Sequence, residues 1–381
     1  MEITSPRPTM TVGATPSAMR RDVAIVTGEL EPSPGGGRAL LTQLNRDAMD
    51  DLFGASLLGI QIARRRLHGW KAVKCAFSGH VDGLDDDVIA AVVATLEQAG
   101  VRKVLIDGSN FGALADAIKR NLPGVEVTTF FHNCEARFFL GVFRQQPGIR
   151  ASGVLLANYI AERLAVRGSD KRICLNSRDS GLLRRVYGRG ATHLSAMAMR
   201  DKFPATDTPP PQVPAAPYVL FVGGAFYANI QGIRWYADHV AAQVSMPAYV
   251  VGNGFERWRA ELEQRSGNMR VVGAAPDLAP WYLGASAIIA PIFDGSGMKT
   301  KVAEALMFGK RVVGTPEAFA GYEDFIGSIG ESCTTAAGFV AAMGKVAATG
   351  APDVDPVLRR IYESNFSFEA AKTRLAAILG Q

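Results

Sequence analysis

A proline-rich segment in the middle of the chain most constrains what the chain can fold into. Residues 201–217, DKFPATDTPPPQVPAAP, contain six prolines in 17 positions. Proline has no backbone N–H and a fixed φ, so this segment can continue neither a helix nor a central strand. We interpret it as a linker between two domains, because a chain of 381 residues is also too long for one ordinary core.

Short apolar runs alternate with helical patterns on both sides of this linker. The runs predict strands at 22–28, 103–108, 125–133 and 171–177 before it, and at 218–224, 248–254, 269–274, 286–292 and 311–316 after it. Helices are predicted at 38–54 and 366–380. Such alternation is typical of parallel sheets with crossover helices. The predicted fold class is therefore α/β, with two Rossmann-like α/β/α domains facing each other across a cleft.

The composition shifts along the chain give the expected boundaries. We expect a disordered N-terminus at 1–20, an N-terminal domain at 21–200, the linker at 201–217, a second domain at 218–360, and a C-terminal helix at 361–381 that packs back on the first domain.

The overall composition narrows the function. A net charge of +5 favours anionic ligands or a membrane surface and is too small to indicate nucleic-acid binding. The four cysteines form no CxxC pair, which argues against a zinc site or a disulfide framework and fits a reducing cytoplasm. No apolar run reaches the roughly 20 residues that a spanning helix needs.

The chemistry is concentrated in residues 294–316, DGSGMKTKVAEALMFGKRVVGTP. A glycine turn runs into a helix, whose free N–H groups and dipole attract anions. Lys299 and Lys301 add full positive charge, so a diphosphate is the expected ligand. Glu304 lies one turn further on and, as an ionised acceptor, suits the two hydroxyls of a ribose. The segment matches neither GxGxxG nor GxxxxGK[ST], the usual nucleotide fingerprints.

This segment resembles the donor-binding signature of GT-B glycosyltransferases, in particular the family 4-like group (glycosyl transferases group 1) of bacterial polysaccharide pathways. FVGGAFYANIQGIRWY (221–236) is similar to that group's glycine loop, and VVGNG (250–254) and the segment 271–297 follow in the same order. The resemblance is close over 218–325 and looser in the first domain. It implies a GT-B fold.

The resemblance also implies roles for individual residues. Lys301 would hold the diphosphate and Glu304 the ribose. Other residues expected near the diphosphate and sugar are Gly36, Gly37, Gly224, Ser296, Gly297, Met298 and Lys299; those expected near the ribose and base are Gly252, Gly273, Asp277 and Leu278. Ser296 stands where many members carry a sugar-binding glutamate, a departure for which Asp294 is a candidate substitute.

The catalytic group is expected from the first domain. His132 and Glu135 follow the predicted strand 125–133, and Asp107 ends the strand 103–108. If the reaction inverts the anomeric centre, a base must deprotonate the acceptor, and each of these three residues qualifies. If it retains, no strong base is needed and His132 is expected to hydrogen-bond the donor sugar. No DxD-like metal site ends a strand, so transfer is predicted to be metal-independent.

A basic stretch at 60–75 is the remaining unusual feature. No acidic residue occurs between 52 and 81, while the stretch carries Arg64, Arg65, Arg66, Trp70, Lys71 and Lys74. It can be a solvated face, or a patch that meets anionic lipid headgroups or a lipid-diphosphate acceptor.

Together these features predict a hexosyltransferase that moves a sugar from a UDP- or GDP-linked donor to a glycan or lipid-linked saccharide, in bacterial exopolysaccharide or cell-surface polysaccharide biosynthesis. The nucleotide sugar is a substrate, and no cofactor and no nucleic-acid partner are expected. The expected location is the cytoplasm, with peripheral attachment at the inner membrane. The alternatives are a sugar-nucleotide 2-epimerase of the same fold and a non-catalytic GT-B protein that binds nucleotide sugar or glycan.

Overall fold

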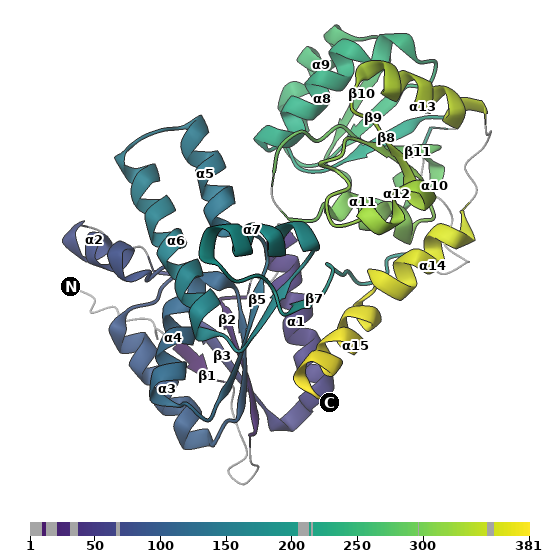
Figure 1. Cartoon of the computed structure of the whole chain (residues 1–381). Coiled ribbons are helices and arrows are strands. Elements are labelled where there is room, and N and C mark those ends of the chain that lie inside the picture. Colours follow the sequence, from purple (N-terminus) through teal and green to yellow (C-terminus); the bar gives the residue numbers. More distant parts are fainter. Residues whose placement is uncertain are drawn as a thin grey trace, which may run out of the picture. The chain divides into compact units, whose positions relative to one another are not determined.

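The computed structural model describes residues 10–12, 21–30, 37–65, 69–204, 213–214, 216–295, 297–348 and 354–381. The chain divides into two compact units: the first comprises Met1–Met197 together with Ala371–Gln381, and the second is Ala198–Ala370. Most of the predicted linker and the N-terminal segment lie outside the described residues. Each unit has its own sheet and is considered separately below (Figure 1).

The first unit is built on a seven-stranded sheet of order β1-β3-β2-β4-β5-β6-β7. All neighbouring pairs are parallel except β1 with β3. The strands are β1 Met10–Val12, β2 Val23–Gly28, β3 Leu57–Ile62, β4 Lys103–Asp107, β5 Glu126–Phe131, β6 Lys171–Cys174 and β7 His193–Leu194. The central strands are mostly apolar and are buried along nearly their whole length, as expected when helices cover both faces of a parallel sheet.

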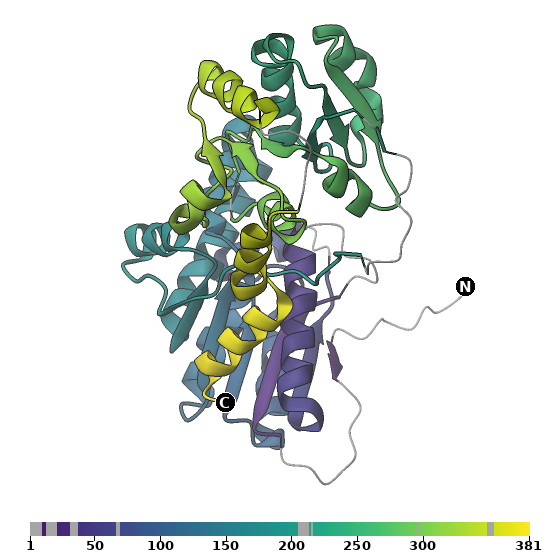
Figure 2. The ribbon, with the colours of Figure 1, turned by 90° about the vertical axis from the view of Figure 1, so that its right-hand side faces the viewer.

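Helices cover both faces of this sheet. Helices α1 and α15 lie on one face, where Lys372 of α15 pairs with Asp51 of α1 at 3.3 Å, and α3, α4 and α6 lie on the other (Figures 1 and 2). The end of α15 is held by Lys103 and Lys171, whose ammonium groups donate to its last carbonyls. The helices are α1 Gly37–Phe53, α2 Gly69–Ser78, α3 Asp86–Ala99, α4 Gly112–Asn121, α5 Glu135–Gln145, α6 Ile149–Gly168, α7 Ser177–Tyr187 and α15 Phe368–Leu379.

The second unit contains a six-stranded, fully parallel sheet of order β10-β9-β8-β11-β12-β13. Its strands are β8 Val219–Val222, β9 Ala248–Val251, β10 Met269–Gly273, β11 Ala287–Ala290, β12 Val312–Gly314 and β13 Gly330–Ser332. Its helices are α8 Tyr227–His239, α9 Arg259–Arg265, α10 Ala279–Gly284, α11 Thr300–Met307, α12 Ile326–Ile329, α13 Ala336–Ala348 and α14 Pro356–Asn365.

The predicted α/β class with parallel sheets is confirmed, and each predicted strand and helix is present with small differences at its ends. Two segments differ from the prediction. Residues 60–62, assigned to the basic stretch, are the end of the buried strand β3, whose backbone pairs with β2 over six residues. Residues 10–12, assigned to a disordered N-terminus, form β1, because the outer edge of β3 offers unpaired backbone groups to an extended segment.

Candidate functional site

Lys301 is a buried cation at the start of α11 in the second unit. Its side chain is only 6% exposed, and its ammonium lies 4.1 Å from the centre of the Phe221 ring. Lys301 Nζ donates to Asn229 Oδ1 at 2.9 Å, and Asn229 Nδ2 in turn donates to the Gly224 carbonyl at 2.8 Å. Lys301 is therefore fixed between β8, α8 and the glycine loop that connects them.

The electrostatics of Lys301 suit an anionic ligand. Burial lowers its pKa from 10.5 to about 7, although the nearby carboxylate of Glu304 acts in the opposite direction. The described residues give its ammonium one hydrogen-bond acceptor, which is a neutral amide. An ammonium group has three N–H donors, and a buried charge is costly unless it is paired. A diphosphate bound here would supply the missing charge and acceptors.

Glu304 lies one turn after Lys301 on the same helix and is partly exposed. Tyr282 donates its hydroxyl to Glu304 Oε2 at 2.8 Å, and the Tyr282 ring stacks on Phe308 with centroids 4.9 Å apart. The stacked ring fixes the hydroxyl, which in turn orients the carboxylate. Glu304 is thus held by a neutral donor and keeps acceptor capacity for a ligand's hydroxyl groups.

The glycines at the strand ends bring backbone close to Lys301. A Cβ on Gly223 would lie 2.7 Å from Asn229 Nδ2 and 3.4 Å from Lys301 Nζ, and one on Gly252 would lie 1.9 Å from the Gly223 carbonyl oxygen. Both glycines have φ near 155°, which side chains rarely adopt. These positions exclude any larger residue, because Asn229 and the Gly223 backbone already fill the space that a side chain would need.

Other residues predicted for the nucleotide have internal partners. Asp277 Oδ1 accepts from the N–H of Ala279 at 2.9 Å, at the start of α10, and Leu278 is the N-cap residue of that helix. Gly273 has a φ of 83° at the end of β10, beside the carboxylate of Glu256. Asp277 therefore caps a helix in this structure, while Gly273 leaves its turn free of a side chain.

The turn before α11 is held together by its own contacts. Lys299 Nζ pairs with Glu317 Oε1 at 2.9 Å and donates to the Gly297 carbonyl at 3.1 Å. Met298 is buried against Gly321, where a Cβ would meet its side chain at 2.4 Å. The charge of Lys299 is thus neutralised internally, unlike that of Lys301. Ser296 and Gly36 lie outside the described residues.

In the first unit, Asp107 and His132 lie at the carboxyl ends of the adjacent strands β4 and β5. His132 Nε2 is 3.1 Å from Asp107 Oδ2, and Asn45 donates to the other oxygen of Asp107 at 2.7 Å. Burial alone would raise the pKa of Asp107, but the charge of His132 and hydrogen bonds from His132, Thr42 and Asn45 lower it. Asp107 therefore stays ionised and accepts the Nε2 proton. His132 Nδ1 is buried and has no hydrogen-bond partner among the described residues.

Glu135 begins α5 and is also buried. Burial raises its pKa from 4.5 to about 7, with Arg38, whose Nη1 is 4.0 Å from Glu135 Oε1, opposing the shift. Below it, the buried Glu162 accepts the backbone N–H groups of Glu135 and Ala136 at 2.8 and 3.1 Å. Glu162 thus caps the N-terminus of α5. These hydrogen bonds offset the cost of burying a second carboxylate close to Glu135.

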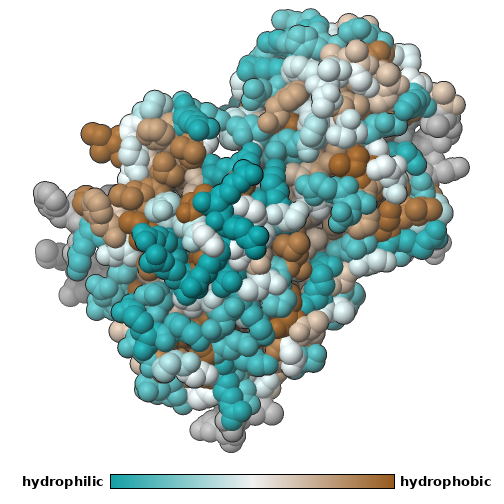
Figure 3. Space-filling view, in the orientation of Figure 1, coloured by the Kyte–Doolittle hydropathy of each residue, from teal (hydrophilic) through white to brown (hydrophobic). Residues whose placement is uncertain are grey.

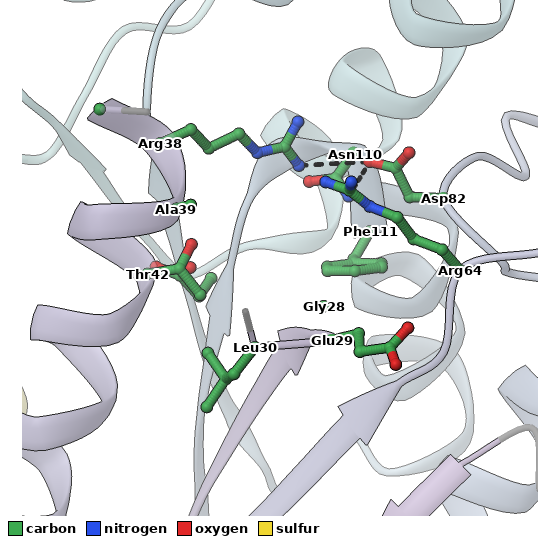
Figure 4. A pocket seen from close by; sticks show the side chains of 12 residues that line it. Gly28, Glu29, Leu30, Arg38, Ala39, Thr42, Arg64, Asp82, Asn110 and Phe111 are labelled. Atoms are coloured by element: carbon green, nitrogen blue, oxygen red, sulfur yellow. Dashed lines mark hydrogen bonds and ion pairs between the residues drawn. The ribbon is translucent and has the colours of Figure 1, made fainter. Parts of the chain in front are cut away.

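A cavity of about 530 Å³ opens beside Asp107. Figure 4 shows the guanidinium groups of Arg38 and Arg64 near Asp82 and Asn110 at one end of it. Asp82 Oδ2 accepts from Arg38 Nη2 at 3.3 Å and from Asn110 Nδ2 at 2.9 Å. Gly37, at the start of α1, also lines the cavity. The cavity is therefore charged and polar at this end.

The basic stretch 60–75 does not form one surface in the described residues. Arg64 lines the cavity, whereas Arg65 pairs with Asp85 at 3.3 Å and Lys74 with Asp86 at 3.7 Å. Arg66 and the side chains of Trp70 and Lys71 lie outside the described residues. Asp85 and Asp86 lie at the start of α3 and neutralise Arg65 and Lys74. Neither of these basic residues has an acidic residue near it in the stretch itself.

Several site residues were not predicted from the sequence: Asn45, Asp82 and Asn110 in the first unit, and Asn229 and Tyr282 in the second. Asn229 carried a usable signal, because it is a polar residue in the first turn of the helix that follows a predicted glycine loop. Within the described ranges, no cluster of three or more His, Cys, Asp or Glu side chains is placed to hold a metal ion. None of the described helices is long and apolar enough to span a bilayer.

Comparisons with known proteins concern the fold of the chain and the sequence of its second unit. Residues 216–348 match the model of the family "Glycosyl transferases group 1". Sucrose-phosphate synthase from Thermosynechococcus elongatus is similar in structure, with 17% identity, a TM-score of 0.66, and coverage of 94% of this chain and 98% of that one. Anabaena HepE, solved with UDP and glucose, shows 12% identity, a TM-score of 0.63 and coverage of 94% and 99%.

An E. coli trehalose-6-phosphate structure with UDP-2-fluoro glucose bound shows 11% identity, a TM-score of 0.60 and coverage of 94% and 99%. A comparison with curated protein sequences finds no match. The chain has two α/β units whose sheets are parallel apart from the edge strand β1. Together with these structural similarities, they show that the chain has the GT-B fold of glycosyltransferases. The sequence similarity to the group 1 glycosyltransferases extends over residues 216–348.

Proposed function

We propose that this protein transfers a sugar from a nucleotide-diphosphate sugar to a glycan or lipid-linked saccharide. The proposal rests on the buried Lys301. Among the described residues its ammonium donates only to a neutral amide, and Glu304 lies one turn further along α11. Both residues lie inside the segment that matches the glycosyltransferase family. The second unit would bind the donor and the first unit the acceptor.

At the donor site, the diphosphate would lie against Lys301 and the first turn of α11. The ammonium and the helix N-terminus would then stabilise the negative charge that develops on the leaving diphosphate. Glu304, oriented by Tyr282, would accept hydrogen bonds from the ribose hydroxyls. The glycine ends of β8 and β9 would allow the diphosphate to approach the backbone. Because this machinery neutralises the leaving group with protein charges, we propose that transfer needs no metal ion.

In the first unit, we propose that His132 acts on the transferring sugar or the acceptor. Asp107 accepts the Nε2 proton, so in its neutral form the ring would present Nδ1 as an acceptor with no described partner. In an inverting reaction Nδ1 would take the acceptor's proton. In a retaining reaction the same ring would hydrogen-bond the donor sugar. Glu135, whose pKa of about 7 allows it to exchange protons near neutral pH, is the second candidate base.

UDP-sugars are the first donors to test, because the Anabaena and E. coli structures contain UDP and UDP-2-fluoro glucose. GDP-sugars are the second. We further propose a role in bacterial surface or exopolysaccharide synthesis in the cytoplasm, which rests on the family match alone.

The test is turnover over a panel of UDP- and GDP-sugars, with and without bacterial membrane extract as acceptor and with and without EDTA. Nucleotide diphosphate released only with acceptor, in the presence of EDTA, supports metal-independent transfer. Isomerised donor without acceptor supports a 2-epimerase instead. Saturable binding without turnover across the panel would contradict both enzymatic functions.

A further inference from the structure

Helices α5 and α6 form a hairpin with unusual burial. They are joined by residues 146–148 and pack along each other, and their far end stands clear of the sheet of the first unit (Figure 1). In α5, all of whose residues are described, Glu135 is the only buried side chain. Yet this helix carries five large apolar residues, namely Phe138, Phe139, Leu140, Val142 and Phe143. Its apolar surface therefore does not serve the core.

The exposed apolar side chains continue into α6. Ile149, the first residue of α6, is 95% exposed. Further large apolar side chains on the hairpin are also exposed, namely Phe138, Leu140, Val142, Val154 and Leu156. Figure 3 shows brown, hydrophobic residues gathered over this end of the hairpin. A contiguous exposed apolar area of this kind indicates an interaction surface, whereas single exposed apolar residues do not.

A groove enclosed by α5, α6 and α7 adds to this surface. It has a volume of about 540 Å³ and is lined almost entirely by apolar side chains, including Leu140, Phe143, Leu155 and Tyr159. Arg137 is the charged residue among those that line it. The hairpin is thus apolar both on its outer faces and between its helices.

The charges of the hairpin point to the kind of partner. Residues 136–161 contain three arginines, Arg137, Arg144 and Arg150, and no Asp or Glu. The whole chain, in contrast, has 41 basic and 36 acidic residues. Apolar side chains at the end of a helical hairpin, accompanied by basic residues alone, are complementary to a bilayer surface with anionic headgroups. A long arginine side chain can lie along apolar surface while its guanidinium reaches a phosphate.

We propose that the end of the α5–α6 hairpin inserts into the headgroup region of an anionic lipid bilayer. Ile149 and the exposed phenylalanine and leucine side chains would enter the acyl boundary, and Arg144 and Arg150 would bind lipid phosphates. The contact is therefore centred on the hairpin and not on the basic stretch 60–75. The proposal does not depend on the proposed function, because its test involves no turnover.

The test is flotation of the full chain with vesicles of phosphatidylcholine alone or of phosphatidylcholine with phosphatidylglycerol. We expect binding to the anionic vesicles that weakens at high salt. Ile149→Asp should reduce this binding roughly tenfold or more, because an exposed apolar anchor is replaced by a charge. Since Ile149 is almost fully exposed, the variant should fold normally, which circular dichroism checks. The matched control is Val357→Asp, an exposed apolar residue on α14.

Arg144→Gln and Arg150→Gln test the electrostatic part of the contact. Each should weaken binding to anionic vesicles about fivefold and leave binding to neutral vesicles unchanged. Failure of the wild type to float with anionic vesicles, or equal flotation of wild type and Ile149→Asp, would overturn the proposal. A dimer in light scattering that Ile149→Asp dissociates, without vesicle binding by the wild type, would assign the surface to a second copy of the chain and would also overturn it.

Discussion

The two candidate sites of this protein have opposite electrostatic character. In the second unit, a buried ammonium, Lys301, is hydrogen-bonded to a neutral amide. In the first unit, three buried carboxylates, Asp107, Glu135 and Glu162, surround His132 and the start of α5. The ammonium of the first arrangement has no hydrogen-bonded carboxylate among the described residues, whereas the second arrangement gathers several carboxylates. This difference is the basis for our proposal that the second unit binds an anion and that the first unit holds and moves protons.

The largest expected effect lies on the cationic side of this comparison. Lys301→Met should lower kcat/KM for the nucleotide sugar by roughly 100- to 1,000-fold, because it removes the charge that stabilises the leaving diphosphate. The melting temperature should stay equal or rise, since a buried unpaired charge is replaced by an apolar side chain of similar length. Steady-state kinetics and thermal unfolding provide the two measurements.

The matched control is Lys299→Met, two residues earlier, where the charge is already neutralised by Glu317. Its kcat/KM should fall less than about tenfold. If both lysine variants lost activity equally, the distinction between a ligand-binding and a structural lysine would be wrong.

On the acidic side, His132→Ala should lower kcat by roughly 100-fold or more while leaving UDP affinity unchanged. Asp107→Asn should produce a similar loss, because the amide oxygen would accept from Asn45, the amide nitrogen would donate to Nε2, and the ring would present the other tautomer. Glu135→Gln distinguishes the second candidate base. If Glu135→Gln lowered kcat roughly 100-fold while His132→Ala retained most of its activity, Glu135 would be the catalytic group.

A smaller effect is expected at the ribose position. Glu304→Ala should weaken UDP binding about tenfold, corresponding to the loss of one or two charge-assisted hydrogen bonds. Tyr282→Phe, which removes only the hydroxyl that orients the carboxylate, should weaken it less. Isothermal titration with UDP measures both. Unchanged affinity in Glu304→Ala would remove the ribose assignment without affecting that of Lys301.

The two sites also differ in how far the sequence predicts them. Lys301 and Glu304 lie three positions apart on one helix, so a local pattern contains both. Asp107 and His132 were predicted as separate candidates, because their pairing depends on β4 and β5 being neighbours in the sheet. The partners Asn45 and Asp82 come from two further segments, Asn110 directly follows β4, and none of the three had a local signal.

The same reasoning explains the predicted and missed parts of the fold. Most strands were predicted because each is an unbroken apolar run between turn residues. Strand β3 was missed because Gly59 and Gln61 interrupt its run and arginines follow it directly. The pairing of Lys299 with Glu317 and of Arg65 with Asp85 depends on tertiary contacts that charge patterns alone do not contain.

The dependence of UDP affinity on pH tests the buried-lysine account most directly. Lys301 has a pKa of about 7 in the free protein, below its ordinary 10.5, so it is mainly neutral above pH 7 and must take up a proton to bind a diphosphate. The affinity of the wild type should therefore fall about tenfold for each pH unit above 7, while that of Lys301→Met stays flat. A wild-type affinity that is independent of pH in this range, or a Lys301→Met variant that binds UDP as tightly as the wild type, would contradict the account.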